Sequence, residues 1–174
     1  MAKNTHLEHI EDDIVNSGKS GGLNAVKFLR ELGDMLSQPR GASKLTITTK
    51  WDGAPAVVCG RDPNNGMFFV GTKSVFNKSN AKIGYTEQLI DYHYPNPGLN
   101  AVLKTCFKHL PDLGITGILQ GDLLFTDNKS TKTINGESVI SFQPNTIVYT
   151  VPVNSTIGKE INSAKMGIVF HTSY

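Results

Sequence analysis

The spacing of apolar residues changes at Pro39, and this change limits what the chain can fold into. Before Pro39, apolar residues recur at helical spacing and form one face, made of Ala25, Phe28, Leu29, Leu32, Met35 and Leu36. After it, residues 45–50, "LTITTK", alternate as in a strand with one face toward a core. The sequence therefore predicts a helical N-terminal part, ended by Pro39 and Gly41, followed by β-structure.

The segment before this helix contains a glycine-rich interruption. Leu7, Ile10 and Ile14 predict a short opening helix, and "GKSGG" at residues 18–22 separates it from the next one. The interruption partly resembles a phosphate-binding loop, but it lacks the earlier glycine and no strand precedes it, so we interpret it as a helix break. His6 and His9 lie among acidic residues, which indicates a solvated polar face more strongly than a metal site.

Downstream of residue 50, strand-like segments are separated by turn-forming residues. Residues 56–60 and 67–71 are joined by "RDPNNG", which predicts an antiparallel hairpin. A brief helix is expected around residues 89–90, and an amphipathic helix over residues 99–110 is expected to lie across the sheet. Further strands are predicted in "GITGILQGDLLFT", on both sides of a turn at Asn135 and Gly136, in "NTIVYTVP" and in "MGIVFHT", with a short helix near Ser155. The predicted class is α+β, with mainly antiparallel sheets and flanking helices.

Composition narrows the function classes. A chain of 174 residues with 39% hydrophobic content is expected to form one domain over residues 1–174. The net charge of +2 gives no indication of tight electrostatic binding to nucleic acid, and no apolar run approaches the ~18 residues of a membrane span. Cys59 and Cys106 lie in apolar surroundings, which predicts buried free thiols in a reducing, cytoplasmic compartment with no membrane partner.

The stretch "KWDG" places Lys50 directly before Trp51, Asp52 and Gly53. A lysine is a useful nucleophile only when burial or nearby positive charge keeps part of it neutral. Its attack on the α-phosphorus of a nucleoside triphosphate gives a phosphoramidate, and a divalent metal offsets the phosphate charge. Asp52 could hydrogen-bond or coordinate, and Gly53 would let the backbone approach a sugar. An exposed lysine and aspartate near a strand end is the alternative interpretation.

Polar residues also interrupt the later apolar strands, where each needs a partner. Asp122 follows Gly121 within "LQGDLLF", and its apolar surroundings favour a role in a site. Trp51 is explained as well by packing as by stacking on a base, whereas the alternation of Tyr149 with Ile147 and Val151 favours packing over base stacking. His171, after "GIVF", is interpreted as structural.

This series of motifs resembles the adenylating domain of the covalent nucleotidyltransferase superfamily, which comprises DNA and RNA ligases and mRNA capping enzymes. The resemblance covers about residues 45–170, in "KWDG", "GTKS", "LQGDLLF" and "TIVYTVP". It implies a ligase-like nucleotidyltransferase (ATP-grasp-like) domain that uses ATP or another nucleoside triphosphate with Mg²⁺ or Mn²⁺. The amino-acid sequence of these motifs is also similar to that of an uncharacterised protein family encoded by tailed bacteriophages, which implies a viral origin.

The resemblance implies a role for each matching residue. Lys50 would carry the nucleotide, with Asp52 and Lys73 as further catalytic residues. Asp122 would contact the ribose or the metal. The implied nucleotide-binding residues are Trp51, Gly53, Ser74, Gln120, Asp122, Tyr149 and Lys165.

Three departures from the superfamily pattern leave alternatives open. Asp122 stands where the pattern has Glu, Met166 stands where it has another Glu, and its last basic motif would follow "GIVF", where this sequence ends at Tyr174. A thioether is a poor ligand for Mg²⁺. The leading hypothesis is a lysyl-nucleotide at Lys50 in ligase-like chemistry, acting on nucleic-acid ends or with a phage protein in the host cytoplasm. The alternatives are a nucleotide-binding protein without turnover and a virion-associated structural protein.

Overall fold

The computed structural model describes residues 5–6, 9–37 and 48–174. The chain forms two compact units, of which one is His6–Lys50 and the other contains Trp51–Tyr174.

The His6–Lys50 unit contains the helix α1 (Ile10–Ser37), whose path breaks at Gly18. Gly18 has φ 55° and ψ −126°, outside the helical region, so the predicted break in the glycine-rich stretch is confirmed. The segments before and after the kink pack closely, because a Cβ at Gly21 would lie within 2.9 Å of the Ile14 nitrogen. The helix ends at Ser37, while Pro39 and Gly41 lie outside the described residues. Of the strand predicted over residues 45–50, residues 48–50 are described, and they are not in a strand.

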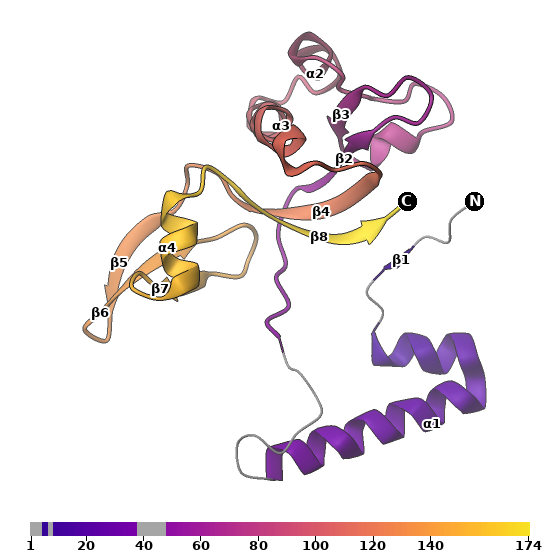
Figure 1. Cartoon of the computed structure of the whole chain (residues 1–174), viewed down its shortest axis with the longest axis vertical. Helices are drawn as coiled ribbons and strands as arrows, with labels where there is room; N and C mark the ends of the chain where they lie inside the picture. The colour runs from indigo at the N-terminus through magenta and orange to yellow at the C-terminus, as the bar shows by residue number, and fades with distance from the viewer. Residues whose placement is uncertain (1–4, 7–8, 38–47) are drawn as a thin grey trace. The chain divides into compact units, whose positions relative to one another are not determined.

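A five-stranded sheet has the strand order β1-β8-β4-β2-β3, and its strands β2, β3, β4 and β8, all in the larger unit, pair antiparallel. Its strands are β1 (Thr5–His6), β2 (Ala56–Arg61), β3 (Phe68–Gly71), β4 (Ile118–Phe125) and β8 (Gly167–Ser173). The predicted hairpin is confirmed, since β2 and β3 pair antiparallel. β4 lies between β2 and β8 and pairs antiparallel with both, and Figure 1 shows β4 and β8 side by side.

A second, three-stranded sheet has the order β5-β6-β7. It consists of β5 (Ser130–Ile134), β6 (Glu137–Phe142) and β7 (Tyr149–Pro152). The turn predicted between β5 and β6 is confirmed, because Asn135 and Gly136 have the positive φ values that two-residue hairpin turns require. The helix α4 (Thr156–Ser163) follows β7, and the Ser155 hydroxyl accepts a hydrogen bond from the Gly158 N–H at its start.

The main core lies between the larger sheet and the helices α2 (Glu87–His93) and α3 (Pro97–His109). Leu103 and Cys106 of α3 belong to the same buried cluster as Cys59 of β2, so the predicted packing of this helix on the sheet is confirmed. Short 3₁₀ helices, η1 (Lys73–Phe76) and η2 (Leu110–Leu113), follow β3 and α3. Both cysteines are buried free thiols, as predicted, and burial raises the pKa of each to about 12.

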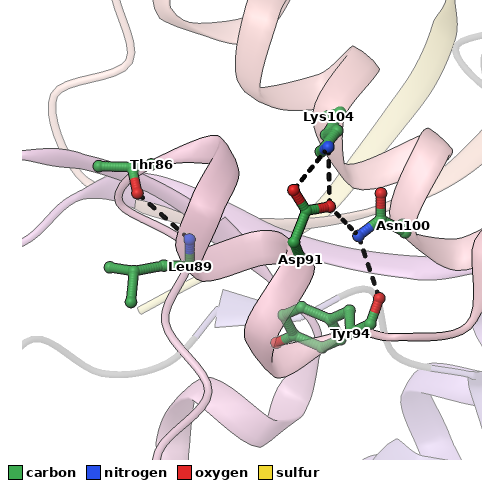
Figure 2. Close-up of polar contacts among 6 residues, drawn as sticks. All are labelled: Thr86, Leu89, Asp91, Tyr94, Asn100 and Lys104. Atoms are coloured by element: carbon green, nitrogen blue, oxygen red, sulfur yellow. Dashed lines mark hydrogen bonds and ion pairs between the residues drawn. The ribbon is translucent and has the colours of Figure 1, made fainter.

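A polar network joins α2 to α3 at the surface (Figure 2). The Lys104 ammonium lies 2.7 and 2.9 Å from the two Asp91 carboxylate oxygens, and the Asn100 amide donates to the same carboxylate at 2.9 Å. Asn100 also donates to the Tyr94 carbonyl at 3.1 Å. The Lys104 hydrogen bond, followed by that of Asn100, lowers the pKa of Asp91. This network therefore links the two helices that cover the sheet.

The structure confirms an α+β class with mainly antiparallel sheets and flanking helices. None of the helices in the described ranges is long and apolar enough to cross a membrane.

Candidate functional site

The larger sheet has one face covered by α2 and α3, and we call the opposite one its outer face. Leu123 of β4 lies in the core beneath α3. Because successive side chains of a strand point to opposite faces, its neighbours Asp122 and Leu124 belong to the outer face. Directly paired residues share a face, which places Asp122 with Ala56 of β2 and Val169 of β8. The polar interruptions of β4, Gln120 and Asp122, therefore both lie on the outer face.

Asp122 has a close neighbour in His171. Gln120 pairs with Thr172, whereas the next residue of β4, Gly121, pairs with Phe170, so His171 is the extra residue of a β-bulge. The His171 Nε2 atom lies 3.3 Å from the Asp122 Oδ1 atom. The two side chains are 16% and 18% exposed, so a ligand can reach them although the sheet restrains both.

Two further contacts extend this polar group along the outer face. The Nδ1 atom of His171 lies 2.9 Å from the hydroxyl oxygen of the buried Thr172. The Tyr174 hydroxyl donates at 2.7 Å to the side-chain carbonyl of Gln120, which is 5% exposed. Gln120 is therefore already bonded within the protein, whereas Asp122 is the more accessible of the two predicted β4 residues.

The segment containing "KWDG" lies along β4. The Ala54 N–H donates to the Leu123 carbonyl at 3.0 Å, and the Leu123 N–H donates to the Pro55 carbonyl at 3.1 Å. A Cβ on Gly53 would lie within 2.8 Å of the Leu123 carbonyl carbon and closer still to its oxygen. Gly53 is thus required by the close approach of this segment to the β4 backbone. Its predicted approach to a sugar stays a prediction.

Trp51 and Asp52 are fixed by Tyr149 of the second sheet. The Asp52 N–H donates to the Tyr149 hydroxyl oxygen at 2.8 Å, and that hydroxyl donates back to the Asp52 carbonyl at 3.1 Å. The Trp51 ring lies 5.0 Å from the Tyr149 ring and 6.2 Å from that of Phe142, measured between centroids. Both predicted base-stacking residues therefore pack within the apolar cluster between the two sheets.

An apolar cavity of about 360 Å³ opens beside Trp51. Its walls come from β4, β6, α4 and β8, and include Phe142, Ile161 and Val169. Met166, which stands where the superfamily pattern has Glu, also lines it. The wall at this position is therefore a thioether rather than a carboxylate.

The predicted lysines all have exposed side chains. Lys50 is the last residue of the His6–Lys50 unit and is joined by its peptide bond to Trp51, so their Cα atoms are about 3.8 Å apart. Lys73 is in η1. Lys165 is close enough to Lys129 for its charge to act there: burial, followed by the Lys165 charge, lowers the pKa of Lys129.

Ser74 has a structural environment. Its hydroxyl oxygen lies 2.9 Å from that of Thr72 and 3.1 Å from that of Tyr94. Tyr94 in turn donates to the Lys82 carbonyl at 2.7 Å, so this cluster closes the loop around η1. The structure thus groups Trp51–Gly53 with Tyr149 and places Asp122 on the adjoining strand, while the Ser74 hydroxyl contacts Thr72 and Tyr94.

Sequence reasoning missed the contact between His171 and Asp122. Strict alternation along "GIVFHT" offers no sign of a bulge, and the bulge determines which face His171 occupies. The available signal was a histidine and an aspartate, each within a predicted strand.

Comparison with known proteins identifies the family. The model of a family described as "Family of unknown function (DUF6267)" matches residues 4–174, and the chain belongs to this family. No curated protein and no solved structure matches the chain.

Proposed function

We propose that this protein binds ATP or another nucleoside triphosphate on the outer face of the larger sheet, and that Lys50 forms a covalent bond to the nucleotide. The proposal includes a ligase-like nucleotidyltransferase fold for the larger unit. One observation carries it: Ala54 and Pro55, which directly follow "KWDG", are hydrogen-bonded to Leu123 of β4, the strand that holds Asp122. Two motifs far apart in sequence, each with a polar residue expected in a site, therefore both lie close to β4.

The chemistry assigned to Lys50 is attack on the α-phosphorus by its neutral amine. The P–N bond forms, the P–O bond to the β-phosphate breaks, pyrophosphate leaves with that electron pair, and the proton on nitrogen passes to solvent. The segment after Lys50 is held at three points, by Leu123 through Ala54 and Pro55 and by Tyr149 through Asp52. Such anchoring supports the proposal because a nucleophile needs a defined position relative to its target.

The residues present fit a divalent ion that arrives with the nucleotide. Asp122 offers carboxylate oxygen, the donor that Mg²⁺ prefers, and the imidazole of His171 lies beside it. Mg²⁺ in nucleotide sites is commonly held by one or two carboxylates together with phosphate oxygens and water. Asp122 would hold the ion, which would offset phosphate charge. No step of the proposal depends on a further protein ligand.

The test is intact-mass analysis after incubation with each nucleoside triphosphate and Mg²⁺ or Mn²⁺. The expected result is an added nucleotide monophosphate in the wild type, absent in Lys50→Ala, and removed by acid because phosphoramidates are acid-labile. Lys159→Ala, which removes another exposed lysine, is the matched control and should retain the adduct. An adduct that persists in Lys50→Ala would refute the assigned nucleophile.

A second function, nucleotide binding without turnover, is favoured by Met166 in the cavity wall, since a thioether is a poor ligand for Mg²⁺. Trp51 is the only tryptophan of the chain, so its fluorescence reports binding at this segment. Saturable quenching by ATP, with neither adduct nor pyrophosphate release, would select this function. Without saturable binding of any nucleotide, both proposals fail and a structural role, such as association with a virion, is left.

A further inference from the structure

We infer that His171 is a positioning residue, which orients the Asp122 carboxylate toward a ligand hydroxyl group through a hydrogen-bond chain that begins at Thr172. The inference rests on the proposed nucleotide site and adds to it a residue that the sequence pattern had indicated as structural.

The bulge in β8 makes this arrangement possible. In a regular antiparallel pair, successive residues point to opposite faces, so His171 and Thr172 could not both border the outer face. The extra residue at position 171 breaks this alternation between Phe170 and Thr172. Bulges are frequent next to active sites because they redirect a side chain without disrupting the rest of the sheet. Here the redirected side chain is the imidazole that contacts Asp122.

The contact with Asp122 determines how the imidazole can act on it. A carboxylate only accepts hydrogen bonds, so Nε2 is the donor in this contact. The other ring nitrogen, Nδ1, lies 2.9 Å from the Thr172 hydroxyl oxygen. Thr172 is 5% exposed and therefore holds its hydroxyl in a fixed environment. Hydrogen-bond distances thus join Thr172, His171 and Asp122 in series.

Asp122 keeps the capacity to bind a ligand in this arrangement. The contact with His171 uses Oδ1, and an ionised carboxylate has about four lone-pair sites on its two oxygens. With 18% of the side chain exposed, a sugar hydroxyl can donate to it from solvent. His171 thereby restricts the rotation of the carboxylate, so the hydroxyl meets an acceptor that is already oriented.

The experiment compares binding of ATP, 2′-deoxy-ATP and 3′-deoxy-ATP to the full chain, followed by Trp51 fluorescence or calorimetry. We expect Asp122→Asn and His171→Ala each to weaken ATP binding by about tenfold, the scale of one hydrogen bond to a charged group. Both variants should also lose discrimination between ATP and one deoxy analogue. His171→Gln, whose amide can still donate to Asp122, should recover part of both effects, which a purely structural role for His171 does not predict.

Thr172 supplies the matched pair of variants. Thr172→Val removes the hydroxyl with almost no change of shape and should reduce sugar discrimination, whereas Thr172→Ser keeps the hydroxyl and should behave as the wild type. Independently of any ligand, ¹⁵N NMR of the His171 ring should show a proton on Nε2 in the wild type. Thermal melts of all variants identify any that fail to fold. If His171→Ala or Asp122→Asn does not fold, Thr172→Val and the NMR measurement test the role of His171.

The possible outcomes separate the two proposals. If the wild type binds no nucleotide, the proposed function and this inference are both overturned. If the wild type binds ATP and Asp122→Asn loses it, while His171→Ala and Thr172→Val keep the affinity and discrimination of the wild type, the nucleotide site stands and the role of His171 is refuted. A His171 ring without a proton on Nε2 would also refute it.

Discussion

Replacing Gly53 with alanine should separate the "KWDG" segment from β4. The new Cβ would lie within 2.8 Å of the Leu123 carbonyl carbon, and the obstacle is strand backbone, which cannot rotate away as a flexible side chain would. Overpacking of this kind costs about 1–3 kcal/mol. Displacement of the segment also lengthens the 3.0 Å hydrogen bond from Ala54 to Leu123, worth about 1 kcal/mol. We therefore expect Gly53→Ala to lower the free energy of unfolding by about 2–4 kcal/mol.

Thermal denaturation and tryptophan fluorescence would measure this effect together. For a chain of this size, the expected loss corresponds to a decrease of Tm by roughly 4–16 °C. The emission of Trp51 should shift to longer wavelength as its ring leaves the cluster with Tyr149. Gly117→Ala is the matched control, because a Cβ there meets nothing within 4 Å and its φ is not positive. A Gly53→Ala variant with the stability and emission spectrum of the wild type would refute this account of the segment.

Three other predictions follow from the same structure. Tyr149→Phe removes both hydrogen bonds to the Asp52 backbone and should cost about 1–3 kcal/mol in urea denaturation, with a change in Trp51 emission. Lys104 lowers the pKa of Asp91, so the ionised carboxylate stabilises the fold at pH values above its unfolded pKa of about 4. This stabilisation is lost as the pH falls through the lower folded pKa. Asp91→Asn should flatten that part of the plot of stability against pH, and an unchanged plot would contradict the role of Asp91. Both cysteines, with pKa values raised to about 12, should resist iodoacetamide at pH 8 in the native protein and react in urea, as mass spectrometry would show.

The fold class followed from the sequence where local signals were strong. The helix break at Gly18, the turn at Asn135 and Gly136, and the helix that covers the sheet depend on residue types and spacing within a few positions of each other. The strand predicted up to Lys50 was wrong over its described part, residues 48–50. Alternation over a short polar stretch is a weak signal, because threonines also fit extended coil.

The candidate site was less predictable, because its residues are positioned by long-range backbone pairing. The contact between Asp122 and His171 depends on a bulge, and a shift of one residue reverses the face of a side chain. The role of Gly53 likewise depends on how close its backbone lies to Leu123, which no local pattern records. Tyr149 was identified as a candidate, but its bonds to Asp52 join β7 to a segment far away in the sequence.

These contacts determine how Lys50 would have to work in the proposed reaction. The segment that follows it is fixed by main-chain bonds to β4 and by Tyr149, so the backbone near Lys50 is restrained while its own side chain is exposed. An exposed lysine in water is protonated at neutral pH and is a poor nucleophile. The bound nucleotide itself would therefore have to exclude water from the amine, and the rate of adduct formation should rise steeply with pH, because attack needs the neutral amine. A pH-independent rate between pH 7 and 9 would show that another step limits the reaction.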